Sequence, residues 1–214
     1  MELQEVKRLV YGGENQHVEF KRKVKFPEKI IKEIVAFANT DGGHLFIGVD
    51  DDKTITGVRF AEEEHFIMDK AIAELCRPEI DYRSEIIPLN DDFAILHYHI
   101  LESKKKPHFA FLRKEHRFGK AFIRIDDRSV QASAEIRRIL KHQHKETSLG
   151  FEYGEHERKL LQHLDQYDRI TLKEFIEISQ LSIKRASDIL VTLAVSNVIR
   201  IVPNEREDWF EFAE

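Results

Sequence analysis

The sequence predicts an α+β protein with two domains, and three observations predict it. Strand-like alternation and helical apolar stripes are interspersed through residues 1–145, which predicts a mixed-sheet domain. A polar stretch that contains two glycines follows, and it predicts a linker at residues 146–155. Residues 156–214 then carry three helix patterns and a closing β-hairpin, which predicts a second, smaller domain.

The chain begins with a short predicted helix at residues 3–10, which two glycines close. Residues 17–23, HVEFKRK, alternate in polarity and predict a strand. Val18 and Phe20 of this strand would face the core, whereas Glu19 would face the other side.

An apolar stripe predicts a helix that begins at Pro27, which suits a first helical position, and runs to Asn39. Gly42 and Gly43 then allow a tight turn. Residues 44–49, HLFIGV, are apolar on both faces after the histidine and predict a central strand. The three aspartates that follow have two interpretations. They form a surface turn before a returning strand at 54–58, or they belong to a metal or nucleic-acid site.

The remainder of the first domain follows the same two patterns. A helix is predicted around 60–75, and two alternating segments predict paired strands at 80–89 and 93–101. Residues 119–133 predict a further strand and turn, and Ser133 offers an N-cap for a helix at 134–143.

The second domain shows helices with clear starting signals. Thr171 and Glu174 form a capping box that opens one helix, and Ser182 caps the next, at 183–196. Asn197 suits a left-handed stop, and the segments VIRIV and WFEF predict a hairpin. Three helices followed by a hairpin predict a winged helix-turn-helix, a fold that serves DNA binding and protein docking alike.

Composition narrows the class of protein. Hydrophobic residues make up 42% of the 214 residues, enough for a packed core. Cys76 is the only cysteine, so no intrachain disulfide can form and a reducing cytoplasm fits best. No segment approaches the ~20 apolar residues that span a bilayer, so we expect a cytoplasmic protein with no membrane partner.

Charge is distributed unevenly. Residues 1–150 hold 26 Lys and Arg against 26 Asp and Glu, whereas residues 151–214 hold 8 against 13, which accounts for the whole net charge of −5. The cations of the neutral part cluster in the segments FKRK and SKKKPH. Clustered cations attract phosphate, although a single cluster is more often ordinary solvated charge.

Three segments closely resemble the Schlafen AlbA-like domain: GENQHVEFKRK, EIVAFANTDGGHLFIGVDDDKTITGV and GKAFIRIDDRSVQAS. They cover roughly residues 10–143, and FIRID, where the family has a YIR strand, is the weakest match. The resemblance implies a nucleic-acid-binding protein, described in bacteria as a transcriptional regulator and commonly joined to a winged helix. Because the domains of this family tend to pair, it also implies a homodimer.

The resemblance extends to a set of acids. In animal Schlafens a related domain cleaves transfer RNA with three acidic residues and a divalent metal. Carried over to this sequence, these catalytic and metal-binding acids fall on Glu14, Glu19 and Asp51, with Asp50 as the alternative for the third. Such carboxylates suit Mg²⁺ or Mn²⁺, which can activate water. The same acids could equally serve structure alone.

Other cofactors are not expected. The chain has neither GxxxxGK[ST] nor GxGxxG, which argues against ATP. His97 and His99 share a strand face that zinc could use, but no third ligand stands at a fixed spacing from them. We therefore expect both to be solvent-facing strand residues.

Nucleic-acid binding, DNA or RNA, is the function we expect, mainly through phosphate contacts. The predicted contacts are cations of the two clusters, of FIRIDDRS and of the third helix in the second domain: Lys21, Arg22, Lys23, Lys104, Lys105, Lys106, Arg124, Arg128, Lys184 and Arg185. Two rivals remain, a metal-dependent ribonuclease and a protein-interaction adaptor. Since the second domain is acidic, docking is slightly favoured over DNA reading there.

Overall fold

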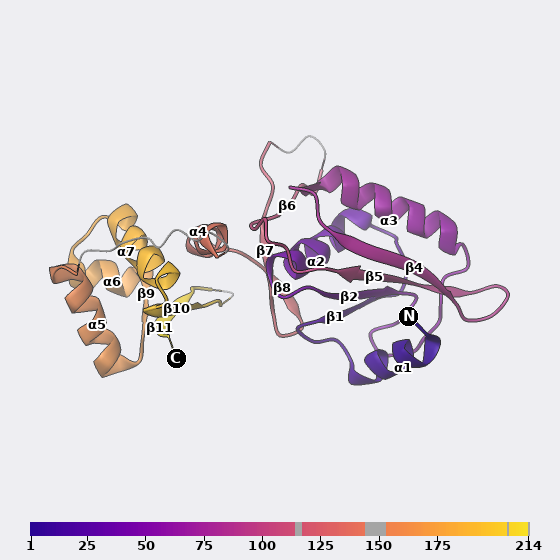
Figure 1. Cartoon of the computed structure of the whole chain (residues 1–214), viewed down its shortest axis with the longest axis horizontal. Helices are drawn as coiled ribbons and strands as arrows, with labels where there is room; N and C mark the ends of the chain where they lie inside the picture. The colour runs from indigo at the N-terminus through magenta and orange to yellow at the C-terminus, as the bar shows by residue number, and fades with distance from the viewer. Residues whose placement is uncertain (114–116, 144–152, 205, 214) are drawn as a thin grey trace. The chain divides into compact units, whose positions relative to one another are not determined.

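The chain divides into two compact units, Met1–Gln131 and Ala132–Glu214, which are visible in the computed structural model of Figure 1. The structure describes residues 1–113, 117–143, 153–204 and 206–213. Most of the predicted linker at 146–155 lies outside these residues. The domain bounds predicted at 145 and 156 stay predictions.

A four-stranded mixed sheet forms the centre of the first unit. The strand order is β1-β2-β5-β4, in which β1 and β2 are parallel and the other neighbours are antiparallel. This arrangement confirms the mixed sheet. The strands are β1 (Val18–Lys21), β2 (Gly43–Ile47), β4 (Tyr82–Pro88) and β5 (Ala94–Ile100).

Helices cover both faces of this sheet (Figure 1). On one face, α2 (Pro27–Asn39) and α3 (Ala61–Leu75) share a core with Leu45, Leu96 and Tyr98. On the other face, α1 (Leu3–Gly12) packs its buried valines against apolar residues of β1 and β2. The predicted central strand is therefore β2, which is buried from both sides.

The turn from α2 into β2 requires Gly42 and Gly43, because neighbouring atoms lie too close for a side chain. Gly42 has φ +75°, and a Cβ there would lie 2.7 Å from the carbonyl oxygen of Ile100. A Cβ on Gly43 would lie 2.4 Å from the ring of Phe37. The turn thus passes between the helix and the sheet with no room for a side chain.

The aspartates after β2 form a turn. The amide of Lys53 donates to the carbonyl of Asp50, and the amide of Asp50 donates to the carbonyl of Thr54. The predicted returning strand at 54–58 is reduced to isolated bridges, Val49 with Ile55 and Val58 with Ala94.

Two small antiparallel pairs complete the first unit. The predicted strand at 119–133 is a hairpin whose first strand packs on α2, and a second pair joins the end of α3 to a later loop. The sequence does not predict this second pair. The four strands are β3 (Cys76–Arg77), β6 (Phe109–Ala110), β7 (Phe122–Ile125) and β8 (Arg128–Gln131).

The second unit contains four helices and a three-stranded antiparallel sheet of order β10-β11-β9 among its described residues. The predicted caps are confirmed: Ser133 accepts from Ile136, Thr171 and Glu174 form a capping box, and Asn197 has φ +56°. The elements are α4 (Ala134–His142), α5 (Glu155–Tyr167), β9 (Arg169–Thr171), α6 (Leu172–Ser179), α7 (Ile183–Val195), β10 (Ile199–Val202) and β11 (Trp209–Phe212).

Within the second unit, α4 packs against α7. Arg138 of α4 donates to Asp188 of α7 at 2.5 Å, and Ser187 of α7 donates to Glu135 at 2.5 Å. None of the helices in the described parts of the chain combines the length and apolarity that crossing a bilayer requires.

Candidate nucleic-acid interface and carboxylate cluster

A buried ion-pair network lies where β1, α2 and β7 meet. Glu19 of β1 is only 5% exposed, and its Oε2 accepts from Arg124 Nη1 at 2.8 Å. The same Nη1 donates to Glu33 Oε2 of α2 at 3.2 Å. One guanidinium therefore serves two buried carboxylates, a charge-assisted arrangement that suits its planar fork.

Arg124 is held by several internal partners through its two terminal nitrogens, whereas its buried Nε has no hydrogen-bond partner among the described residues. Its side chain has no exposed surface, and its Nη2 donates to the carbonyl of Asn15 at 2.8 Å. Its guanidinium lies 4.8 Å from the centre of the Phe37 ring, within the range of a cation–π contact. The structure corrects the prediction that Arg124 contacts nucleic acid, because a guanidinium buried among internal partners does not reach a phosphate.

The charges in this network act on Glu19. Burial raises the pKa of the Glu19 carboxyl, and the neighbouring Glu33 carboxylate raises it further. The ammonium of Lys21, which donates to Glu19 Oε1, acts in the opposite direction. Glu19 is thus a carboxylate held inside the protein by cations of the chain itself.

The remaining predicted acids differ in their partners and in their exposure. Glu14 accepts from the amide of Phe20 at 2.8 Å and lies near enough to Glu19 to raise its pKa. Asp50 is half-buried, with its carboxylate 3.4 Å from Arg22 Nε, and Asp51 is exposed on the turn.

We tested whether these acids fit the divalent metal that the resemblance implies. Among the described residues, no group of three or more His, Cys, Asp or Glu side chains is arranged to hold a metal ion. The structure brings Glu14 and Glu19 together and adds Glu33, which the sequence interpretation does not include. Asp50 and Asp51 do not complete a ligand set with them, so the residues do not fit the metal in this arrangement.

The predicted cations differ in exposure. Arg22, Lys23, Lys104 and Lys105 are exposed, whereas Lys21 is half-buried against Glu19. Arg128 at the start of β8 is exposed as well.

The structure corrects the prediction that Lys106 contacts nucleic acid, because its side chain is only 2% exposed. Its Nζ donates to the carbonyl of Thr40 at 2.7 Å and to Glu102 at 2.9 Å, so it ties the loop after β5 to the end of α2. Lys106 is therefore a structural cation.

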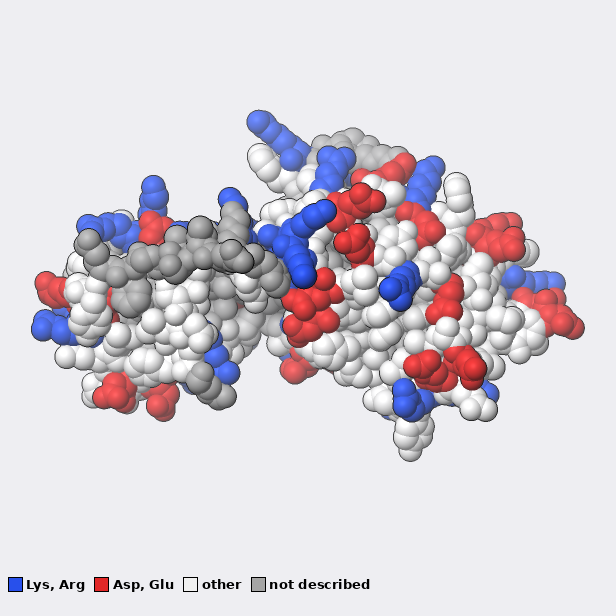
Figure 2. All heavy atoms as spheres, viewed as in Figure 1, with Lys and Arg blue, Asp and Glu red and all other residues white. Residues whose placement is uncertain are grey.

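Four of the predicted cations that are exposed form two separate clusters. The cluster of Arg22 and Lys23 follows the end of β1, where Lys21 pairs with Ile47. The cluster of Lys104 and Lys105 adjoins Lys106 at the opposite end of β2, where Gly43 pairs with Ile100. Figure 2 shows acidic and basic side chains interspersed over the face of the first unit in view.

In the second unit, Lys184 and Arg185 are exposed in the first turn of α7. The next turn is occupied, because Ser187 accepts from Arg138 at 3.0 Å and Asp188 binds the same guanidinium. The helix expected to read DNA is therefore covered in part by α4.

The structure also corrects the prediction that His97 faces solvent, because this residue is only 3% exposed. Its Nε2 lies 2.9 Å from His44 Nδ1, and its Nδ1 lies 2.9 Å from Glu85 Oε1. Burial, followed by the charges of nearby histidines, lowers the pKa of His44 to about 4. Burial also lowers the pKa of His97, although Glu85 opposes it. Both shifts favour the neutral form of the rings, which lie on adjacent strands of the sheet.

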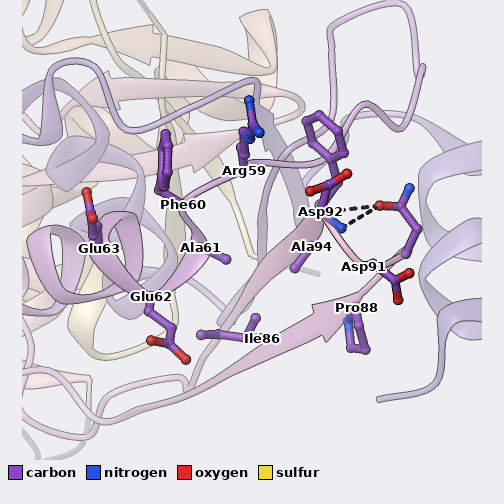
Figure 3. A pocket seen from close by; sticks show the side chains of 12 residues that line it. Arg59, Phe60, Ala61, Glu62, Glu63, Ile86, Pro88, Asp91, Asp92 and Ala94 are labelled. Atoms are coloured by element: carbon purple, nitrogen blue, oxygen red, sulfur yellow. Dashed lines mark hydrogen bonds between the residues drawn. The ribbon is translucent and has the colours of Figure 1, made fainter.

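An open pocket of about 400 Å³ lies between the start of α3 and the turn that joins β4 to β5 (Figure 3). Asn90 holds this turn by accepting from the amides of Asp92 and Phe93, both at 3.0 Å. Acids outnumber the single cation Arg59 in its lining, which disfavours a phosphate ligand. None of the predicted site residues lines it.

Comparison with solved structures gave several similar chains, including the following two. The N-terminal domain of a RecG-related protein from Nitrosomonas europaea is 19% identical, with a TM-score of 0.45, over 58% of this chain and 89% of that one. The DIP2311 protein from Corynebacterium diphtheriae is 13% identical, with a TM-score of 0.44, over 86% of this chain. This chain covers 33% of that protein.

The family comparison matches the region that contains the carboxylate network and both cation clusters of the first unit. Residues 14–133 match the model of the Schlafen AlbA_2 domain. This match extends over more than half of the chain and, apart from Gly13, includes the three segments that carry the resemblance. The chain belongs to the Schlafen AlbA_2 family.

Proposed function

We propose that the first unit binds nucleic acid through phosphate contacts and that this binding serves transcriptional regulation. The observation that carries the proposal is the contrast around β1. Glu19 and Glu33 beside this strand bind the internal partner Arg124, whereas Arg22 and Lys23 directly after the strand are exposed. Exposed cations that cluster locally supply the phosphate attraction that dominates non-specific binding. Membership of the AlbA_2 family supports the same role.

The same contrast argues against the ribonuclease alternative. A metal-dependent nuclease needs carboxylate oxygens that are free to hold the metal. Glu19 instead binds Arg124 and Lys21, and Glu14 accepts from the amide of Phe20. We therefore place binding without turnover ahead of cleavage.

For the second unit we propose a winged helix that serves docking. The order α5, β9, α6, α7, β10 and β11 supports a winged helix, with α7 in the place of a recognition helix. A helix of the same unit, α4, packs on α7 through Arg138 and Glu135. This surface already accommodates a helix, which favours the adaptor role over base reading.

Fluorescence anisotropy in EDTA tests these proposals, with labelled transfer RNA and duplex DNA titrated over a range of salt concentrations. We expect salt-sensitive binding of at least one polymer. The paired reversals Arg22→Glu/Lys23→Glu and Lys104→Glu/Lys105→Glu should each weaken binding. They should also flatten the log–log salt slope by about 1 for each phosphate that the variant no longer neutralises.

The matched control is Lys184→Glu/Arg185→Glu, an equal charge reversal on α7. We expect it to leave the affinity nearly unchanged if the second unit is a docking module. A fall in affinity as large as that of the first-unit variants would show that α7 contacts nucleic acid. Absence of binding even at low salt would refute the proposed function of the first unit, and so would cleavage of either polymer in a parallel incubation with Mn²⁺ in place of EDTA.

A further inference from the structure

We propose that Arg124 takes the place of a bound cation among Glu19 and Glu33 and thereby closes this carboxylate cluster to divalent metals. The inference deepens the proposed function by making nucleic-acid binding independent of metal. It concerns residues that lie at the position where the family resemblance implies a metal site.

The oxygen atoms of the two carboxylates carry the argument. Glu19 Oε1 binds the ammonium of Lys21, and Glu19 Oε2 binds Arg124. Glu33 Oε1 lies 3.2 Å from the ammonium of Lys32, and Glu33 Oε2 binds Arg124 and the hydroxyl of Ser129. All four carboxylate oxygens thus have a cationic partner. A hard divalent ion requires several such oxygens at once.

The charge balance also opposes a metal. Three cationic side chains, Arg124, Lys21 and Lys32, face the two buried carboxylates. Because Glu14 also lies near Glu19, these three cations balance three carboxylates, and a divalent ion added to the cluster would meet no net negative charge. An arginine remains charged at every pH that proteins tolerate, so a change of pH does not remove it.

Position distinguishes Arg124 from a mobile surface partner. The side chain has no exposed surface, and its second amino group is held by the backbone carbonyl of Asn15. A metal could enter only by expelling this guanidinium from a site built around it. Arg124 is thus the positioning cation of the cluster, whereas Lys21 is 31% exposed and is able to give way.

Mn²⁺ binding, measured by electron paramagnetic resonance, tests the inference in the full chain. The variants are Arg124→Met, which keeps a long apolar side chain without the charge, and Arg124→Met/Glu19→Gln. Arg128→Met is the matched control, because Arg128 is an exposed arginine of the same hairpin. We expect wild type and Arg128→Met to bind Mn²⁺ only weakly, and Arg124→Met to bind it at least about tenfold more tightly. Adding Glu19→Gln should abolish the gain.

Thermal unfolding with and without Mn²⁺ gives a second measurement. Mn²⁺ should raise the melting temperature of Arg124→Met and leave that of wild type unchanged, because a ligand stabilises only the state that binds it. An Mn²⁺ site in wild type that Glu19→Gln removes would overturn the inference, and this comparison does not need the Arg124 variant to fold. A folded Arg124→Met that binds no Mn²⁺ would also overturn it. Nucleic-acid binding is measured in EDTA and Mn²⁺ binding is measured without nucleic acid. A failure of the proposed function is therefore distinguished from a failure of the inference about Arg124.

Discussion

Asn39 shows how a single buried side chain joins distant segments of the first unit. It ends α2 and is only 1% exposed. Its amide nitrogen donates to the carbonyls of His108 at 3.0 Å and Phe122 at 2.9 Å, while its oxygen accepts from the amide of His108 at 2.7 Å. One side chain thus satisfies three backbone groups of the segments before β6 and within β7.

Replacement Asn39→Ala should lower the free energy of unfolding by about 2–4 kcal/mol, because three buried backbone groups would be left without their partner. Urea unfolding measures this change. Asn90→Ala is the control, since Asn90 accepts two amides in an exposed turn where water can replace it. A destabilisation by Asn39→Ala no larger than that of the control would contradict the structural role assigned to Asn39.

Residues with local partners were the predictable ones. Ser133, Thr171 and Ser182 cap helices as predicted, because each cap bonds an amide three residues away. The burial of Arg124 was not predictable, since its partner Glu19 lies 105 residues earlier. A lone arginine in a strand gives no local sign of such a partner.

At the scale of elements, the histidines form a ladder across β2 and β5. The rings of His44 and His99 stack with centroids 4.5 Å apart, and those of His44 and His97 with centroids 5.1 Å apart. Glu85 of β4 ends the ladder by binding His97. Alternation predicted the strands, but it did not predict that this face would be partly covered.

The ladder predicts a stability that depends on pH. The pKa of His44 falls from 6.5 to about 4 on folding, so the folded state favours the neutral ring. The contribution of His44 is complete above pH 6.5 and disappears as the pH falls from 6.5 toward 4, because the unfolded chain binds the proton first. Urea unfolding at pH 7.5 and at pH 5 should show this decrease in stability.

His44→Gln isolates this effect from other titrating groups. Glu19 acts in the opposite direction, because its raised pKa makes protonation favourable in the folded state. We expect the drop in stability between the two pH values to shrink in His44→Gln. An equal drop in wild type and in this variant would assign the pH dependence to other groups.

At the scale of the whole molecule, each unit has a core of its own. Leu96 of β5 is fully buried in the core of the first unit, and Leu190 of α7 is fully buried in that of the second. Separate cores predict separate cooperative transitions.

Calorimetry of two matched variants tests this independence. Leu190→Ala should cost about 2–5 kcal/mol and lower the melting temperature of one transition by roughly 10 °C or more. Leu96→Ala should lower only the other. If either substitution moves both transitions together, the two units unfold as one.

The order of elements was predictable at this scale, but the partner of α4 was not. The cap at Ser133 fixes where α4 begins, and its amphipathic pattern shows that it packs on something. Neither signal identifies α7 as that partner. The hydrogen bonds of Arg138 to Ser187 and Asp188 join residues that are 49 and 50 positions apart, a separation that no local pattern predicts.

The packing of α4 on α7 has a practical consequence for dissecting the protein. A recombinant fragment that ends after Gln131 would stop at the edge of the first compact unit. A fragment extended through residue 143 would carry α4 without α7, and it would present Ile136 and Leu140, which are buried in the intact chain, to water. The shorter fragment should stay monodisperse at high concentration, whereas the longer one should self-associate through an orphaned amphipathic helix.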